Sequence, residues 1–343
     1  MQISENYKHI CMYNYFQQNN RSKKELTIHM KLNKLLKKAF LLLFLLVFFS
    51  GCSTKKKTWF SRQYHNTTAK YNGYFNGNES IKYGIKKISD SFEDDYSAVL
   101  PVFRNGDLKK SKSTLPYMDK AIQKGSIVIQ KHSIKIRGKE YCRWIDDNYL
   151  MVGKAYFYKG EFDEAAKTFS FIIEEYKKTP IVYKASMWLL RCFIEKKDFV
   201  AAESILIDLT NNRKFPEKLE KDFEKINADF YVRQKNYPLA KVSLLNCINK
   251  YKLKKDKARL NYILAQIFQI EENFKQASKY YNQVLKSNSD YSMVFNTKMN
   301  LALCADKSSK NSEKMRKDLV KMTKDDKNKE YLDQIYYTIA KMD

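Results

Sequence analysis

Four segments of the chain repeat one pattern at intervals of 37 or 38 residues, and this periodicity constrains the fold more than any other feature. Each segment combines an amphipathic stretch, a short polar turn, an aromatic residue and an alanine that begins a second amphipathic stretch. The aromatic residues are Phe162, Phe199, Tyr237 and Phe274, and the alanines are Ala165, Ala202, Ala240 and Ala277. A repeat of this length predicts stacked helix pairs, each in contact mainly with its neighbours.

The first and fourth segments resemble the tetratricopeptide repeat, whose pattern is W-x2-L-G-x2-Y followed by A-x3-F. The first segment has Gly153 at the small position and continues with Ala165-x3-Phe169, and the fourth has Ala265 and Ala277. The two middle segments match less closely. The resemblance implies an all-α fold, a right-handed helical-pair solenoid of tetratricopeptide-like repeats with an irregular helical N-terminal cap.

The repeats are expected to fill residues 140–343, with about four clear units and one or two degenerate or partial ones. Residues 59–139 are predicted to form the helical cap, with a turn at Gly77 between two of its helices. The last amphipathic stretch has no evident partner helix. We therefore expect its side chains to be exposed or covered by another chain, namely Ile335, Tyr336 and Ile339.

The N-terminal part of the sequence resembles a bacterial lipoprotein signal. A basic stretch, Met30–Lys38, precedes eleven apolar residues, Ala39–Phe49, and the small residues Ser50 and Gly51 precede Cys52. Eleven helical residues extend roughly 16 Å, too short for a hydrocarbon core of about 30 Å. The pattern favours a cleaved signal over the alternative, an uncleaved hydrophobic anchor with an incidental cysteine.

Cleavage before Cys52 would leave 292 residues that start with a cysteine carrying diacylglycerol and an N-acyl chain such as palmitate. Residues 30–51 would be the signal peptide and residues 52–58 a lipidated basic tether. Residues 1–29 precede the signal and are interpreted as untranslated or as an extended n-region. The expected location is the periplasmic side of the outer membrane.

The precursor has a net charge of +26, and the chain from Cys52 onward has about +20. An exported lipoprotein rarely meets nucleic acid, so we expect no nucleic-acid partner. The charge favours anionic lipid or an acidic protein partner. Compositional bias is the alternative, because only ten of the 64 basic residues are arginine.

The sequence offers little for catalysis, so we expect neither an enzyme nor a metal or cofactor site. Adjacent carboxylates at Asp146 and Asp147 point to different faces of a helix, and His65 and His132 lie in no metal-ligand pattern. Four cysteines sit about fifty residues apart within apolar helical patterns, and we expect buried thiols there: Cys142, Cys192, Cys247 and Cys304.

Several N-terminal segments together are similar to the PorW/SprE-type lipoproteins of Bacteroidota. The segments are "WFSRQYHNTTAKYNGYFNG", "LPVF", "MDKAIQK" and "WIDDNYLMVGKAYFYKGEF". The resemblance implies a scaffold subunit of the type IX secretion and gliding motility machinery. Its partners would be the periplasmic ring complex and the outer-membrane translocon, and membrane attachment would depend on Cys52. The alternatives are a repeat lipoprotein of outer-membrane β-barrel assembly and a glycan-binding nutrient-uptake lipoprotein.

A repeat solenoid usually binds partners on the face lined by the first helix of each pair. Counting from the small-residue position predicts a mixed basic and aromatic groove suited to an acidic or extended peptide, although ordinary solvated side chains remain an alternative. The predicted residues are Lys154, Phe157, Tyr158, Arg191, Ile194, Lys225, Asp229, Arg233, Tyr262, Gln266 and Gln269.

Overall fold

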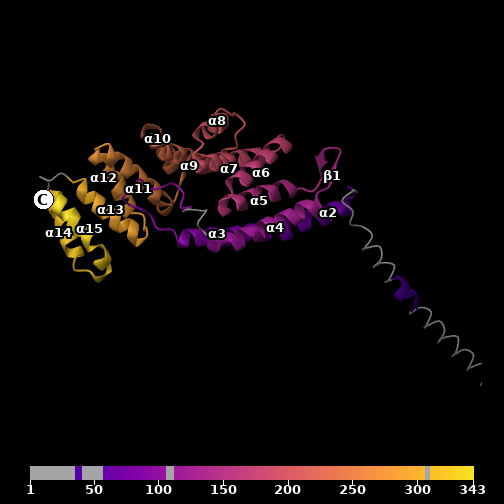
Figure 1. The fold of residues 1–343 in the computed structure, drawn as a ribbon, viewed down its shortest axis with the longest axis horizontal. Helices are drawn as coiled ribbons and strands as arrows, with labels where there is room; N and C mark the ends of the chain where they lie inside the picture. The colour runs from indigo at the N-terminus through magenta and orange to yellow at the C-terminus, as the bar shows by residue number, and fades with distance from the viewer. Residues whose placement is uncertain (1–34, 41–56, 106–111, 306–309) are drawn as a thin grey trace, which may run out of the picture. The chain divides into compact units, whose positions relative to one another are not determined.

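The computed structural model describes residues 35–40, 57–105, 112–305 and 310–343 (Figure 1). The predicted lipidation site at Cys52 lies outside the described residues, as does most of the predicted signal peptide. The chain divides into two compact units. The first comprises residues 1–65 and 134–141, and the second comprises residues 66–133 and 142–343.

The described part of the first unit includes a small β-hairpin that the sequence analysis did not predict. Strands β1 (Lys135–Ile136) and β2 (Lys139–Glu140) pair in antiparallel register. Arg137 and Gly138 form the turn, both with positive φ (52° and 76°), which suits the twist of a two-residue hairpin. The region between the cap and the repeats is therefore not wholly helical.

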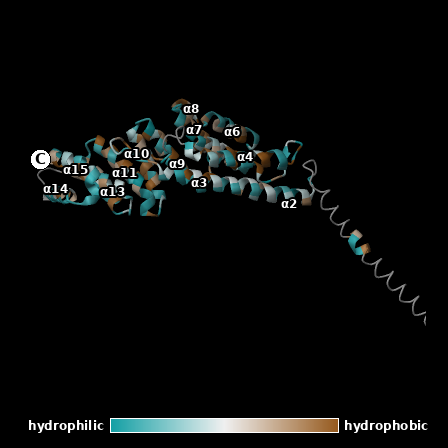
Figure 2. Cartoon of the chain, turned by 60° about the horizontal axis from the view of Figure 1, so that its bottom comes forward, coloured by the Kyte–Doolittle hydropathy of each residue, from teal (hydrophilic) through white to brown (hydrophobic). Residues whose placement is uncertain are grey.

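The second unit is an all-α array of packed helix pairs, and Figure 1 shows the pairs following one another in chain order. Each helix carries both hydrophobic and hydrophilic residues along its length (Figure 2). The pairs are α5 (Ile145–Lys159) with α6 (Phe162–Glu175), α7 (Ile181–Lys196) with α8 (Phe199–Thr210), α9 (Glu217–Arg233) with α10 (Tyr237–Lys250), and α11 (Lys254–Ile270) with α12 (Phe274–Leu285).

The predicted repeat is confirmed position by position. The four turn aromatics are the first residues of α6, α8, α10 and α12. The four alanines that follow them are fully buried where the helices of a pair meet. At Gly153 an added Cβ would lie 2.5 Å from the ring of Phe169, so the first pair needs glycine at this crossing.

The end of each first helix also repeats. Each is followed by a residue in the left-handed conformation, with φ between 57° and 82°: Gly160, Lys197, Lys235 and Glu272. This conformation closes the helix and turns the chain toward the next one. Only the first of these residues is glycine, so composition alone gave no sign of the other three.

The N-terminal part of the second unit packs against the first repeat. This part contains the π-helix η1 (Ala69–Phe75), α3 (Asn76–Asp90), η2 (Lys112–Thr114) and α4 (Leu115–His132). The helix α2 (Trp59–Thr68) falls mainly in the first unit. The predicted turn at Gly77 is wrong, because Gly77 lies within α3. It is buried there, and an added Cβ would lie 2.2 Å from the sulfur of Met151. This glycine permits close packing of helices.

The C-terminal helices close the array with a core of their own. They are α13 (Tyr291–Leu303), α14 (Lys310–Met322), η3 (Asp326–Tyr331) and α15 (Leu332–Met342). The expectation of a last helix without a partner is wrong, because α15 packs against α13 and α14 and Ile335 is fully buried. Ile339 is half-buried in the same core, and Tyr336 is exposed as expected.

Candidate binding face of the repeat array

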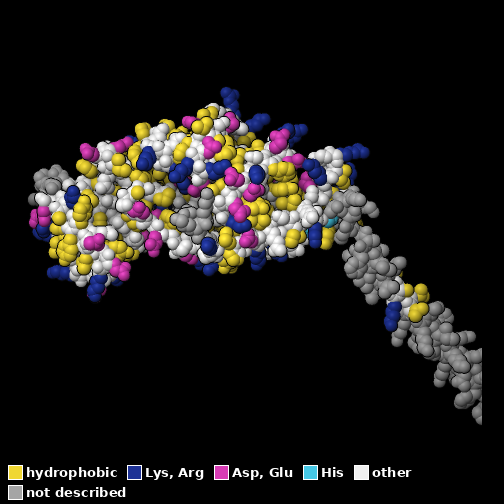
Figure 3. Space-filling view, in the orientation of Figure 1, with side chains coloured by type: hydrophobic (Ala, Val, Ile, Leu, Met, Phe, Trp, Pro, Cys, Tyr) yellow, Lys and Arg dark blue, Asp and Glu magenta, His cyan; other side chains and the backbone are white. Residues whose placement is uncertain are grey.

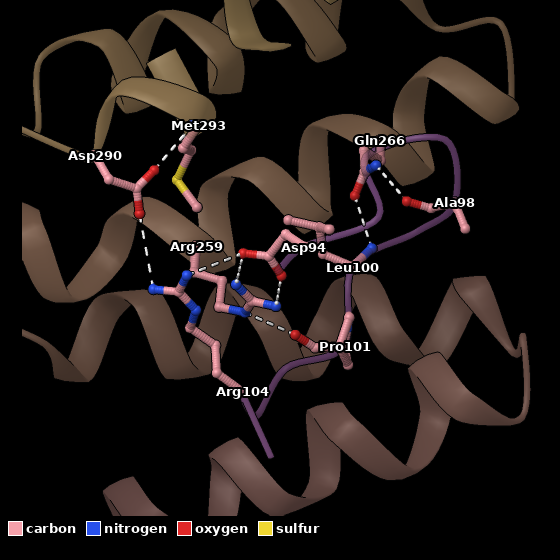
Figure 4. Close-up of polar contacts among 9 residues, drawn as sticks. All are labelled: Asp94, Ala98, Leu100, Pro101, Arg104, Arg259, Gln266, Asp290 and Met293. Atoms are coloured by element: carbon pink, nitrogen blue, oxygen red, sulfur yellow. Dashed lines mark hydrogen bonds and ion pairs between the residues drawn. The ribbon is translucent and has the colours of Figure 1, made fainter. Parts of the chain in front are cut away.

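The first helices of the pairs form what we call the inner face, the side of α5, α7, α9 and α11 that carries Lys154, Arg191, Lys225 and Gln266. The chain's own residues 92–105, here called the inner segment, lie against much of this face. The inner segment follows α3 and forms neither helix nor strand. Figure 4 shows it passing beside the helices that hold it.

A buried ion pair fixes the start of the inner segment. The guanidinium of Arg259 donates two hydrogen bonds, of 2.6 and 2.8 Å, to the carboxylate of Asp94, whose side chain is 1 % exposed. The Nε of Arg259 also donates to the carbonyl of Pro101 at 2.8 Å (Figure 4). Arg104 lies 3.5 Å from Asp94 and 3.7 Å from Asp290, the N-cap of α13. A bidentate pair of this kind is both strong and geometrically selective.

The side chain of Gln266 holds the backbone of the inner segment. Its Nε2 donates to the carbonyl of Ala98 at 2.7 Å, and its Oε1 accepts from the N–H of Leu100 at 2.9 Å. Gln266 is buried, so these bonds satisfy an amide that would otherwise be costly to bury. This is the pairing that a neighbouring strand would give, here supplied by one side chain.

Apolar side chains of the inner segment complete the core of the repeats. Leu100 is fully buried and Val102 is 1 % exposed, and both belong to the core formed by α9 to α13. Tyr96 packs edge-to-face on Tyr262, with ring centroids 5.4 Å apart. The inner segment is thus an integral part of the fold.

Two basic side chains of the inner face contact the aromatic ring near the end of the inner segment. The guanidinium of Arg191 lies 4.3 Å from the ring centroid of Phe103 and 4.3 Å from that of Trp188. The ammonium of Lys225 lies 4.7 Å from the Phe103 centroid. Cation–π contacts at these distances are favourable, but neither cation forms an ion pair with a described carboxylate, and Asp229 acts on both only through longer-range attraction.

The last described residue of the inner segment joins a charged cluster. The amide of Asn105 donates to Glu195 at 3.2 Å, and Arg233 donates to Glu195 at 2.8 and 3.1 Å and to Asp229 at 3.0 Å. Burial raises the pKa of Asp229, and the positive charge of Arg233 opposes that shift. The predicted residue Arg233 is therefore engaged within the chain.

The structure corrects the predicted accessibility of several groove residues. The side chains of Phe157 and Tyr262 are fully buried, and Ile194 is 1 % exposed, because these positions of the first helices face their own pair or the neighbouring one. Gln266 and Asp229 are on the inner face but are covered. Gln269 accepts a hydrogen bond from Tyr281 at 2.7 Å. Tyr158 is half-buried, edge-to-face with Phe157 and Trp188.

The sequence analysis missed the acidic and aromatic residues that bind the inner face from within the chain. Asp94, Tyr96 and Phe103 lie in a stretch with no helical period, so it was assigned to the cap. One signal was available: "FEDDY" and "LPVF" place acidic, aromatic and apolar residues around Pro101, a composition suited to a basic, aromatic groove.

Beyond Phe103, the inner face is hollowed by a pocket of about 320 Å³, here called the cationic pocket. Four basic side chains and one acidic side chain line it, from α5, α7 and α9: Lys154, Lys184, Arg191, Lys225 and Asp222. Aromatic and apolar side chains form the rest of its wall: Tyr74, Phe103, Leu150, Met187, Trp188, Leu219, Ile226 and Tyr251.

The charges in the cationic pocket are not balanced. Burial, together with the nearby charges of Lys184 and Arg191, lowers the pKa of Lys154 to about 8, although the carboxylates of Asp147 and Asp222 oppose the shift. Burial also lowers the pKa of Lys225. Arg191 is 7 % exposed, and its buried Nη2 has no hydrogen-bond partner among the described residues. The pocket thus concentrates positive charge in a partly desolvated place.

Other kinds of site find no support in the described part of the chain. No group of three or more His, Cys, Asp or Glu side chains is placed there to hold a metal ion. None of the helices in those ranges combines the length and apolar character that crossing a membrane requires. The four cysteines are buried thiols, as expected from their patterns. On the face seen in Figure 3, Lys and Arg side chains are scattered among Asp and Glu.

The tetratricopeptide repeat family matches residues 258–291, which cover most of α11, all of α12 and the first residue of α13. This match falls on the fourth of the repeats found in the sequence. No curated protein matches the chain. Tetratricopeptide repeats generally mediate protein–protein interactions, and the stacked pairs reproduce their helical arrangement. The chain is therefore a tetratricopeptide-repeat-containing protein.

Proposed function

We propose that the chain is an outer-membrane-anchored, periplasm-facing scaffold subunit of the type IX secretion and gliding motility machinery. In this role it binds other proteins and catalyses no reaction. Its membrane attachment would be the lipid at Cys52, and its partners would be subunits of the periplasmic ring complex and the outer-membrane translocon.

The observation that carries the scaffold role is the inner face with the segment it holds. Arg259, Gln266 and Arg191 bind an extended stretch of polypeptide through its acidic side chain, its backbone and an aromatic ring. A face with these properties is suited to extended peptides in general. The assignment to type IX secretion rests on the N-terminal segments quoted above and on the lipoprotein signal.

Affinity capture from detergent-solubilised envelopes of the source bacterium tests the partner assignment. A tagged full-length chain should recover ring-complex or translocon subunits, and a strain lacking the protein should lose type IX secretion and colony spreading. Recovery of β-barrel assembly subunits, with many barrels depleted together, would instead support the barrel-assembly alternative. Normal secretion and spreading in the deletion strain would contradict the proposal.

The attachment is tested separately with Cys52→Ala. The variant should lose labelling by radioactive palmitate and accumulate as an unprocessed precursor. Cys142→Ala, at a buried thiol, is the control and should be labelled like the unmodified protein. Persistent labelling of Cys52→Ala would refute lipidation at this position.

A further inference from the structure

We propose that the cationic pocket binds an acidic segment of a partner protein, whose carboxylates are neutralised by Lys154, Arg191 and Lys225. This inference deepens the proposed scaffold function and depends on the chain acting as a protein-binding module. It assigns the place and the chemistry of the contact.

The cationic pocket is continuous with a surface that already binds an extended stretch of this chain. The inner segment runs along the inner face and ends, as described, at Asn105. Phe103 is at once a residue of this segment and part of the pocket wall. The pocket therefore continues a face that already holds extended polypeptide, on the side of α5, α7 and α9.

The pairing of charged side chains differs along the inner face. Where the inner segment is in place, Arg259 has Asp94 as a bidentate partner, and Arg233 has Glu195 and Asp229. In the pocket, no ion pair or hydrogen bond joins the charged heads of Lys154, Arg191 or Lys225 to any residue in the described ranges. Arg191 is buried and the two lysines are half-buried. Charges withdrawn from water in proteins are normally paired, so these three indicate an anion supplied from outside.

The size and the walls of the pocket indicate which kind of anion it takes. At about 320 Å³ the pocket holds one or two side chains and no folded surface. Its walls include Trp188, Tyr251 and Leu150, which suit an apolar or aromatic neighbour of the carboxylate. Within the chain, the inner segment meets the same face with this combination, Asp94 next to Phe92 and Tyr96. An acidic and aromatic peptide fits better than a bare phosphate or a lipid headgroup.

The test is fluorescence titration of the purified chain from Cys52 onward with a labelled hexapeptide of alternating Asp and Phe. A peptide of alternating Lys and Phe serves as the charge-reversed control. The acidic peptide should bind with an affinity that falls steeply with salt. It should also change the tryptophan emission of the chain, to which Trp188 in the pocket wall contributes. The double variant Lys154→Met, Lys225→Met should weaken binding about tenfold or more. Lys275→Met, at an exposed position on α12, is the matched control and should bind as the unmodified chain does.

Circular dichroism and the melting temperature of each variant show that a loss of binding is not a loss of fold. Equal binding of both peptides, or binding unaffected by the double variant, would overturn the proposal. The same holds if inorganic phosphate or phosphatidylglycerol vesicles bind in the pocket and the acidic peptide does not. Failure of this test with intact capture of secretion subunits would refute the pocket and leave the scaffold function standing.

Discussion

Two parts of the inner face use basic side chains in opposite ways. Around α11, Arg259 is fully engaged by Asp94 and Pro101 of the inner segment. Around α5 and α9, Lys154 and Lys225 contact aromatic rings and form no ion pair with a described residue, although Asp147, Asp222 and Asp229 lie near enough to act on their charges. The first arrangement stabilises the fold, and the second stores unfavourable electrostatic energy that a ligand could relieve.

The difference shows that a basic groove residue need not be a binding residue. Arg259, which the sequence analysis did not select, has a structural role, whereas Lys154, which it did select, lies in the open pocket. What separates the two is whether the chain itself supplies the counter-charge. Substitutions around Arg259 and around Lys154 should therefore change the free energy of unfolding by different amounts and in opposite directions.

The largest change in stability is expected where Arg259, which the inner segment covers, loses the counter-charge of Asp94. Asp94→Asn would leave the nearly buried guanidinium of Arg259 uncompensated, since its side chain is 13 % exposed. We expect the free energy of unfolding to fall by about 3–5 kcal/mol, measured by urea denaturation. Asp95→Asn, at the exposed neighbouring position, is the control. Equal effects at the two positions would mean that the ion pair does not hold the inner segment.

Gln266→Leu is expected to lower the free energy of unfolding by a smaller amount. The variant would remove the partner of the Leu100 N–H and of the Ala98 carbonyl, and unsatisfied buried backbone groups are costly. The expected destabilisation is about 2 kcal/mol in the same denaturation experiment. Gln283→Leu, exposed on α12, should change stability little. A neutral result at Gln266 would show that water replaces these bonds readily.

In the cationic pocket, we expect a substitution to raise the free energy of unfolding instead of lowering it. Lys154→Met is expected to stabilise the protein by about 1–2 kcal/mol at pH 7, because it removes a desolvated charge. The folded-state pKa of Lys154, about 8, lies below the ordinary value of 10.5. Between these values the unfolded chain binds more protons, so stability of the unmodified protein rises with pH and the advantage of the variant should disappear by about pH 10.5.

The reversal is checked by comparing denaturation curves of Lys154→Met and of the unmodified protein at pH 7 and at pH 10. Other groups that titrate in this range, such as the buried cysteines, act equally on both proteins and cancel in the difference. Destabilisation at pH 7, or a difference that does not change with pH, would contradict an unbalanced charge at Lys154.

The smallest effect is expected at a cation that is paired on the surface. Lys241 contacts Glu271 with its ammonium, linking α10 to the end of α11. Both side chains are partly exposed, so Lys241→Met should cost less than about 1 kcal/mol. The loss should shrink further in high salt, which is measurable by repeating the denaturation at raised ionic strength. A loss as large as that of Asp94→Asn would remove the distinction between surface and inner-face pairs.

The repeat array was predictable because its signals are local. The spacing of Phe162, Phe199 and their equivalents reports the start of each second helix, and each small residue reports a helix crossing. The inner segment could not be predicted in this way. Asp94 meets Arg259 across 165 residues of sequence, and no period marks an irregular stretch that is held by side chains.

Part of the candidate site was predictable, because the repeat pattern is local and fixes which residues lie on the first helices. The repeat register placed Lys154, Arg191 and Lys225 on the first helices, where they line one pocket. It could not separate exposed from buried positions, so Phe157 and Tyr262 were included although both belong to the core. The rotation of each helix within its pair depends on packing against neighbours, which a single repeat does not encode.

The contrast between the paired Arg259 and the unpaired Lys154 is tested most directly by NMR titration of the Lys154 ammonium. The protein would carry isotopically labelled lysine. Lys154→Met assigns the signal. We expect a pKa of about 8 for Lys154 in the protein alone, and a higher value once the acidic peptide is bound. A pKa near 10.5 without peptide would contradict this expectation, because the pocket charge would then already be balanced.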